Sequence, residues 1–221
     1  MKYLRFKIFQ SLLGPFSSFT RKRRMALYQK KINLEPGMKI LDVGGTASIW
    51  EHIDIPLEIT CLNLPTSKYK PVYKGHHKIK FIEGDGCNLP EFNHGDFDLI
   101  FSNSVIEHVG NWKKQQQFAN EILRLSDNYW VQTPCKLFPI EAHCGMPFWW
   151  HYPENLRQKI LDKWYKKLPA WTIMIKHTTV IEENTLKRLF PEANFLREWF
   201  IFPKSIIVYQ QQQTSKLVNN D

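Results

Sequence analysis

A short apolar segment that runs directly into two glycines constrains this chain more than any other feature. Residues 39–43 read Lys-Ile-Leu-Asp-Val, and Gly44 and Gly45 follow before the small residues of 46–48. An apolar run of this length that ends in a turn is typical of a buried strand. Glycine allows a tight turn and a close approach of the backbone to a ligand. We therefore predict a strand, a ligand-binding turn and a helix over residues 47–53.

Strand and helix patterns alternate along the rest of the chain. Further strands are predicted over residues 57–62, 78–82, 97–102 and 129–133, and helices over residues 1–16, 18–33, 112–125, 154–167 and 182–190. Such alternation is typical of a parallel sheet with helices on both faces. Residues 195–202 and 205–209 read as two more strands, and they indicate an antiparallel hairpin at the edge of the sheet.

Length and composition favour a single α/β domain with one added segment. The chain has 221 residues, of which 43% are hydrophobic and 23% are charged, as in globular proteins. No apolar run approaches the roughly 20 residues of a membrane span, and Arg5 and Lys7 interrupt the place of a signal peptide's apolar core. The four cysteines form no C-x-x-C pair. We therefore expect a cytoplasmic protein with free thiols.

The positive charge is concentrated near the N-terminus. The net charge is +9, and residues 1–39 hold ten Lys or Arg and one acid, whereas the remaining residues hold twenty of each sign. This distribution predicts a basic helical segment over residues 1–35, a near-neutral domain over residues 36–210 and a disordered tail over residues 211–221. A near-neutral body argues against a nucleic-acid-binding surface.

The basic run from Arg21 to Arg24 has three interpretations. A solvated helix face is the commonest origin of such a run. Contact with anionic lipid or an acidic substrate comes next, because residues 1–16 carry apolar side chains at helical spacing. Nucleic acid comes last, since no aromatic residue is interleaved with the run for base stacking.

Two further segments follow the glycine turn. Residues 83–90 hold an acid between two glycines, and residues 97–103 read as a strand that ends in two polar residues. In this order and at this spacing, the three segments resemble a class I S-adenosylmethionine-dependent methyltransferase, and most closely the branch called methyltransferase type 11. The resemblance covers roughly residues 36–135 and extends more weakly to the hairpin at 194–209.

The resemblance implies a fold, a cofactor and a set of site residues. The fold is a Rossmann-like, mostly parallel sheet of seven strands with helices on both faces and an antiparallel C-terminal hairpin. The cofactor is S-adenosyl-L-methionine. The family's roles place Asp42, Gly44, Gly45 and Thr46 at the methionine part and ribose, Asn63 and Leu64 after the second strand, Asp85, Gly86 and Cys87 at the adenine, and Ser102 and Asn103 at the sulfonium side.

The chain departs from the family pattern at two places. Residues 46–48 stand where the family has a third glycine, and Asn63 stands where the family has an acid that grips both ribose hydroxyls. A neutral amide is expected to hold the ribose more weakly than a carboxylate does.

Residues 134–170 break the alternation and are predicted to form an insertion that contacts the methyl acceptor. The segment follows the fifth predicted strand, on the side of the sheet where open α/β folds bind ligands. Glu141, Phe148 and Trp149 are the candidate substrate contacts, and His108, His143 and His151 are the candidate general bases. The alternative is a lid that packs on the cofactor and excludes water. The spacing of Cys135, His143, Cys144 and His151 matches no zinc template, so no metal is predicted.

The sequence leaves three functions to weigh. The first is methyl transfer by in-line displacement to a small-molecule, sugar or lipid-linked acceptor. The second is a noncatalytic protein of the same fold that docks to a partner or an anionic membrane surface through its basic N-terminus. The third is an RNA methyltransferase, which the near-neutral body disfavours. The identity of the acceptor, the atom methylated and the oligomeric state stay open.

Overall fold

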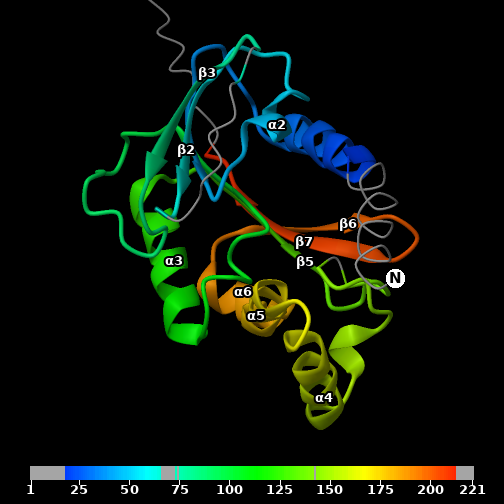
Figure 1. The fold of residues 1–221 in the computed structure, drawn as a ribbon. Helices are drawn as coiled ribbons and strands as arrows, with labels where there is room; N and C mark the ends of the chain where they lie inside the picture. Colours follow the sequence, from blue (N-terminus) through cyan, green and yellow to red (C-terminus); the bar gives the residue numbers. More distant parts are fainter. Residues whose placement is uncertain (1–17, 66–72, 74, 142, 213–221) are drawn as a thin grey trace, which may run out of the picture.

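One seven-stranded sheet organises the molecule (Figure 1). The computed structural model describes residues 18–65, 73, 75–141 and 143–212. The predicted helix over residues 1–16 and residues 213–221 of the predicted tail lie outside these ranges. The strands are β1 (Lys39–Val43), β2 (Glu58–Asn63), β3 (Lys78–Glu83), β4 (Leu99–Asn103), β5 (Tyr129–Pro134), β6 (Asn194–Trp199) and β7 (Pro203–Gln210).

The topology of the sheet confirms the predicted fold class. The strands are ordered β3-β2-β1-β4-β5-β7-β6. The first five strands of the chain pair in parallel, and β7 pairs antiparallel with both β5 and β6. The order of the strands reverses between β1 and β4, which is where open α/β sheets bind their ligands.

Successive residues of the central strands pack in two separate apolar cores, because side chains alternate between the faces of a sheet. On β1, Ile40 enters one apolar cluster and Leu41 the other. On β5, Trp130 lies on the face of Ile40, and Val131 lies on the face of Leu41. A strand buried on both faces reads as a continuous apolar run, as these strands do.

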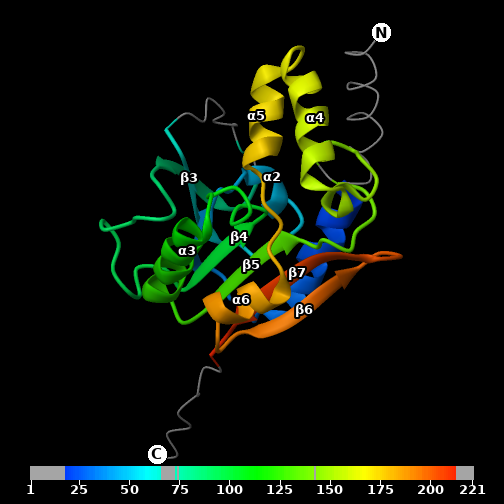
Figure 2. The ribbon, with the colours of Figure 1, turned by 90° about the horizontal axis from the view of Figure 1, so that it is seen from below.

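Helices cover both faces of the sheet (Figure 1, Figure 2). On one face lie α3 (Trp112–Leu125) and α6 (Glu183–Leu189), whose apolar side chains join the cluster of Leu41. On the other face lie the helix over residues 18–31 and the short α2 (Ala47–Trp50), which join the cluster of Ile40. The Asn111 side chain caps α3 by accepting a hydrogen bond from the Lys114 backbone NH.

The helix over residues 18–31 is part of the domain. Met25, Tyr28 and Ile32 are at most 1% exposed and pack in the same cluster as residues of β1, β2 and β4. Arg24 is only 4% exposed, so the interpretation of Arg21–Arg24 as a solvated face is wrong for this residue. Beyond β7, Gln211 and Gln212 are hydrogen-bonded to Asn33 and Asn128.

The insertion after β5 forms a helical hairpin that projects from the sheet (Figure 2). It holds a 3-10 turn, η1 (Trp149–His151), followed by α4 (Glu154–Tyr165) and α5 (Pro169–His177). The hairpin has its own small apolar cluster, centred on Trp149, Leu161 and Ile175. In the described part of the chain, no helix is long and apolar enough to cross a membrane.

Candidate functional site

A cavity of about 910 Å³ opens at the carboxyl ends of β1 and β4. Its walls come from four parts of the chain: the glycine turn after β1, the residues that follow β4, the segment that follows β5, and the turn between β6 and β7. The helix over residues 18–31 closes one side through Thr20, Arg21 and Arg24. The cavity therefore lies where the strand order reverses, as the fold predicts.

The glycine turn forms one wall of the cavity. Gly44 has a φ of +74°, and a Cβ there would lie 2.4 Å from a methyl carbon of Val105. A Cβ on Gly45 would lie 2.1 Å from the carboxylate of Asp42. No side chain fits at either position, so both glycines are required for this turn to pack as it does.

Asp42 is a buried carboxylate with one unsatisfied oxygen. Its Oδ2 accepts a hydrogen bond of 2.8 Å from the Trp50 indole NH, whereas its Oδ1 has no partner among the described residues. Burial raises the pKa of Asp42 to about 7. A buried acceptor that lines a cavity is suited to a ligand that brings a donor or a positive charge.

Asn63 holds the glycine turn from the end of β2. Its Nδ2 donates a hydrogen bond of 2.9 Å to the Gly45 carbonyl oxygen. A carboxylate at this position would have no proton to donate to that carbonyl. The amide therefore makes a contact that the family's acid could not make, and its Oδ1 remains as an acceptor. The next residue, Leu64, is 56% exposed.

The turn at residues 84–88 lies beside the cavity rather than on its wall. The Asp85 carboxylate accepts the Cys87 backbone NH at 2.9 Å, is about half exposed, and lies 3.6 Å from the Lys114 ammonium. A Cβ on Gly86 would lie 2.6 Å from Val43, so this turn packs directly on β1. Burial raises the pKa of Cys87 to about 11, which keeps it a neutral thiol.

The residues at the end of β4 divide between core and cavity. The Ser102 side chain is fully buried and donates to the Val43 carbonyl oxygen at 3.3 Å. Asn103 and Ser104 line the cavity. Ser104 has a φ of 60°, and its backbone NH and side chain are hydrogen-bonded to Gln132 on β5. A positive φ outside glycine costs energy, and here two hydrogen bonds to Gln132 maintain it.

Arg24 connects the strands behind this wall of the cavity through hydrogen bonds. Its five N–H donors each make a hydrogen bond to another side chain: Glu198 twice, Asn103, Gln132 and Ser205. Those partners come from β4, β5, β6 and β7, and the ion pair with Glu198 measures 2.8 Å. Because all five donors are used and Glu198 balances the charge, Arg24 is a structural residue.

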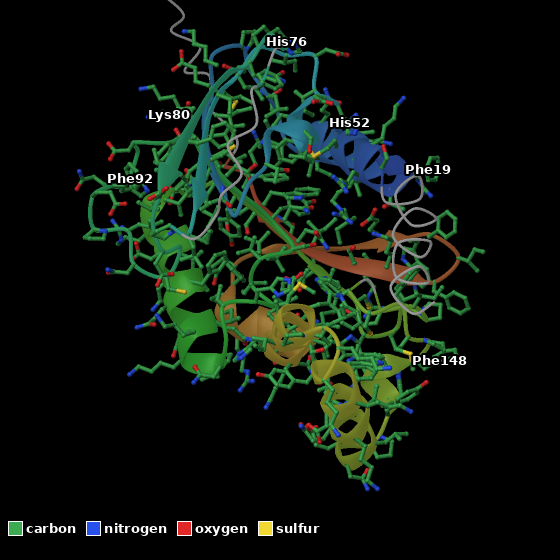
Figure 3. All side chains as sticks on the ribbon, in the orientation of Figure 1. Phe19, His52, His76, Lys80, Phe92 and Phe148 are labelled. Carbon is green, nitrogen blue, oxygen red and sulfur yellow. The ribbon has the colours of Figure 1, made fainter. Side chains whose placement is uncertain are left out.

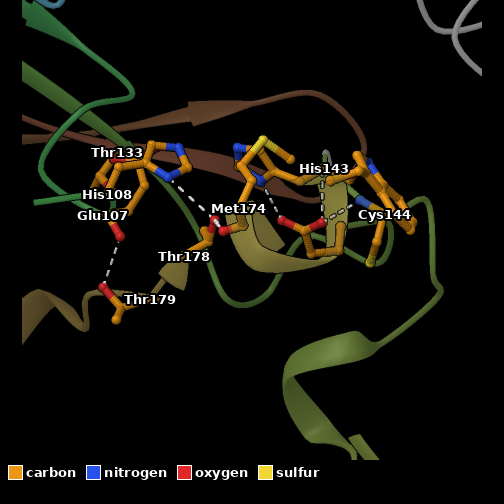
Figure 4. A network of polar contacts seen from close by, with 10 residues as sticks. Glu107, His108, Thr133, His143, Cys144, Met174, Thr178 and Thr179 are labelled. Carbon is orange, nitrogen blue, oxygen red and sulfur yellow. Dashed lines mark hydrogen bonds and ion pairs between the residues drawn. The ribbon is translucent and has the colours of Figure 1, made fainter. Parts of the chain in front are cut away.

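Glu141 and His143 form a hydrogen-bonded pair, and both residues line the cavity. Figure 4 shows His143 within this network of polar contacts. The Glu141 carboxylate accepts the backbone NH groups of His143 and Cys144 at 2.7 Å each. Its other oxygen lies 2.7 Å from His143 Nδ1. Burial alone would lower the pKa of His143, but the hydrogen bond to Glu141 outweighs it and raises that pKa above its ordinary value.

His108 sits against His143 outside the cavity wall (Figure 4). The two rings are 4.9 Å apart and nearly perpendicular. The Thr178 hydroxyl donates to the Met174 carbonyl oxygen, so it accepts from His108 Nδ1 at 3.2 Å. Loss of contact with water, and then the charge of His143, lower the pKa of His108 to about 4. His108 is therefore neutral at pH values where His143 titrates.

Glu107 adds a second buried carboxylate near this pair. Its Oε2 accepts a hydrogen bond of 3.1 Å from Thr133, and its Oε1 has no partner in the described ranges. Burial raises the pKa of Glu107 to about 7.

Three other predicted site residues lie away from the cavity. Trp149 is 2% exposed and stacks on Trp164 inside the small cluster of the helical hairpin. Phe148 is 57% exposed, and the His151 ring lies 6.3 Å from it (Figure 3). Trp150, which the sequence did not single out, lines the cavity instead. Within the described ranges, no group of three His, Cys, Asp or Glu residues could hold a metal ion.

Residues 41–127 match a family model described as a methyltransferase domain. No curated protein sequence matches the chain significantly. Among solved structures, a protein of Nostoc punctiforme assigned as an O-methyltransferase has a TM-score of 0.52 at 12% identity, with 91% of this chain and 59% of that chain covered.

Two further solved structures share the fold. The CurJ carbon methyltransferase has a TM-score of 0.50 at 14% identity, with 82% of this chain and 50% of that chain covered. Phosphoethanolamine N-methyltransferase 2 of Haemonchus contortus, solved with S-adenosyl-L-methionine, has a TM-score of 0.52 at 12% identity, with 79% and 38% covered. The chain thus spans less than two thirds of the length of each neighbour.

Residues 41–127 match a methyltransferase domain, and the chain shares its fold with solved methyltransferases, which agrees with the class I S-adenosylmethionine-dependent resemblance seen in the sequence. The residues present fit the cofactor of this class, because the glycine turn and Asp42 line the cavity and Asp42 offers a ligand there an unsatisfied acceptor. The acceptor atom does not follow from the fold, since the three neighbours are named for oxygen, carbon and nitrogen methylation.

Proposed function

We propose that this chain transfers a methyl group from S-adenosyl-L-methionine to a hydroxyl group of a small-molecule, sugar or lipid-linked acceptor. One observation carries the proposal: the Glu141–His143 pair and the glycine turn after β1 line the same cavity. A cofactor held at the turn and an acceptor held at the pair would therefore share one cavity. Small-molecule sites in proteins are commonly of this size.

The chain's own residues supply positioning and proton transfer. When bound, S-adenosyl-L-methionine supplies an electrophilic methyl group. Asp42 and the backbone of Gly44 and Gly45 bind and orient the cofactor. The cavity walls hold the acceptor oxygen in line with the methyl group, and such positioning removes a large part of the barrier.

His143 is the general base in this proposal. Glu141 fixes the proton of His143 on Nδ1, which leaves Nε2 as the atom that accepts the acceptor's proton. The Glu141 carboxylate then stabilises the imidazolium that forms. A carbon or nitrogen acceptor would have less need of this base, so the pair favours an oxygen acceptor. His108 takes no proton, because its pKa of about 4 makes it a weak base.

Titration calorimetry with S-adenosyl-L-methionine and S-adenosylhomocysteine tests the cofactor site. We expect the wild-type protein to bind both, and we expect Gly44→Val, a change in the turn that lines the cavity, to bind neither. Asp85→Ala, a change beside the cavity, should bind both more weakly. Asp162→Asn, an exposed acid on α4 far from the glycine turn, is the matched control and should bind as the wild type does. Thermal unfolding of each variant separates loss of binding from loss of fold.

An assay of methyl transfer to hydroxylated acceptors tests the chemistry. Loss of activity in His143→Ala with unchanged binding of S-adenosylhomocysteine supports the base assignment. A folded wild-type protein that binds neither cofactor form would contradict the enzyme proposal and favour the noncatalytic alternative. Docking through the basic N-terminus would then have to use residues other than Arg24, whose five donors are satisfied within the domain.

A further inference from the structure

Lys204 is a cation on the cavity wall, and no carboxylate of the described residues forms an ion pair with it. It lies at the start of β7, next to Ser205 of the Arg24 network, and it lines the cavity. Among the described residues, none makes a hydrogen bond or ion pair to its ammonium group. Glu198, the acid whose charge acts on Lys204, already accepts two hydrogen bonds from Arg24.

The surroundings of Lys204 destabilise the charged form of its amine. Arg21 and Arg24 of the helix over residues 18–31 and Glu198 of β6 are the charged groups that face it. Burial, and then repulsion from Arg24, lower the pKa of Lys204 to about 8. A partly buried ammonium without an acceptor is stabilised by any anion that reaches it.

The rim of the cavity beside Lys204 is apolar. Phe200, Ile201 and Phe202 form the turn between β6 and β7 and line the cavity, and they are 40%, 76% and 49% exposed. Ile140, which also lines the cavity, is 42% exposed. Phe19 packs edge-on against Phe200 and extends this rim onto the helix over residues 18–31 (Figure 3). Large apolar side chains gathered at the mouth of a cavity mark a binding surface.

We infer that the cavity takes an anionic amphiphile, with a carboxylate or phosphate group at Lys204 and an apolar body against the rim of Phe200, Ile201 and Phe202. The inference rests on the proposed function, because it describes the acceptor of the same cavity. It narrows the acceptor to a molecule that carries a hydroxyl for the Glu141–His143 pair and an anionic group at the other end. Both a free amphiphile and a membrane lipid have this chemistry.

Binding of octyl phosphate and octanoate to the protein saturated with S-adenosylhomocysteine tests the inference. Octyl glucoside, which has the same tail and no charge, is the ligand control. We expect Lys204→Met to weaken the binding of the two anions by about tenfold or more and to leave the affinity for octyl glucoside unchanged. Methionine keeps an apolar side chain at this position and removes the charge. Lys204→Arg should restore much of the affinity.

Lys80→Met is the matched protein control. Lys80 is an exposed lysine on β3, at the opposite edge of the sheet from β6 (Figure 3). The Lys80→Met variant should bind octyl phosphate as the wild type does.

Ile201→Ser, a change at an exposed position, should weaken the binding of octyl phosphate and leave the binding of inorganic phosphate unaffected. Equal affinity of wild type and Lys204→Met for octyl phosphate would overturn the inference.

Two additional measurements distinguish a membrane lipid from a free amphiphile, and the anion site from the proposed cofactor site. Cosedimentation with vesicles of phosphatidylcholine and phosphatidic acid that requires Lys204 supports a lipid headgroup, whereas binding of octyl phosphate alone supports a free amphiphile. S-adenosylhomocysteine affinity is measured separately for each variant. Lys204-dependent binding of octyl phosphate in a protein that binds no S-adenosylhomocysteine would contradict the proposed function and still support the anion site.

Discussion

At the residue scale, the unsatisfied oxygen of Asp42 links cofactor binding to protons. The carboxyl is largely protonated below its pKa of about 7, and a ligand with positive charge favours its ionised form. We predict that the affinity for S-adenosyl-L-methionine rises with pH up to about 7, by as much as tenfold per unit. Asp42→Asn should bind more weakly and lose this dependence, which calorimetry over a pH series would show. A wild-type affinity that is constant below pH 7 would contradict the prediction.

The Glu141–His143 pair predicts the pH dependence of catalysis. His143 must be neutral to accept a proton, so kcat/KM should rise with pH through a pKa above the ordinary histidine value. Glu141→Gln removes the charge that raises this pKa while keeping an acceptor for Nδ1. The rising limb of the profile should therefore move to lower pH, and its maximum should fall. An unshifted limb would show that Glu141 does not act through His143.

Some residues of the site could be predicted from the sequence, and others could not. Asp42, Gly44, Gly45 and Asn103 were predicted from the resemblance to the methyltransferase motifs, and all four line the cavity. Arg24 and Lys204 were not predicted, because a basic residue in a charged run or a hairpin reads as solvated until its tertiary neighbours are known. Trp149 shows the converse, since an aromatic run does not indicate which ring enters the cavity and which enters a local core.

At the element scale, the helical hairpin of α4 and α5 has a core of its own. Trp164 stacks on Trp149 at 5.6 Å and contacts Trp171 at 5.1 Å. We predict that Trp164→Ala destabilises this hairpin locally, by about 2 kcal/mol, since a half-buried ring is lost. Hydrogen exchange should become faster in α4 and α5 and stay unchanged in β1 and β4. Uniformly faster exchange would show that the hairpin and the sheet unfold together.

The elements themselves were largely predictable. Each predicted strand corresponds to an observed strand, with ends that differ by a few residues, because a sheet buried on both faces leaves continuous apolar runs. Helix α5 was missed because Trp171, Thr172 and Ile173 belong to a β-branched and aromatic run that favours strands. Pro169 at its first turn was the one local signal that pointed to a helix.

At the scale of the whole molecule, the buried pair of Arg24 and Glu198 joins the two ends of the described chain. Breaking such a pair leaves an uncompensated charge, so we predict that Arg24→Met and Glu198→Gln each cost about 3–5 kcal/mol of unfolding free energy. The double variant should cost less than the two losses added together. Urea denaturation of the four proteins gives the coupling energy. Additive losses would show that the two side chains are energetically independent.

The hydrogen bonds of Arg24 to side chains on four strands also determine when the cavity wall can form during folding. They join residues 79, 108, 174 and 181 positions apart, and contacts of such long range slow the folding of a chain. During synthesis, β1 to β5 emerge long before Glu198 and Ser205, so the wall of the cavity cannot be completed until β6 and β7 have left the ribosome. Until then Arg24 stays in water, because burying its charge without Glu198 would be too costly. The parallel strands can therefore assemble early, whereas the binding site is finished only at the end of synthesis.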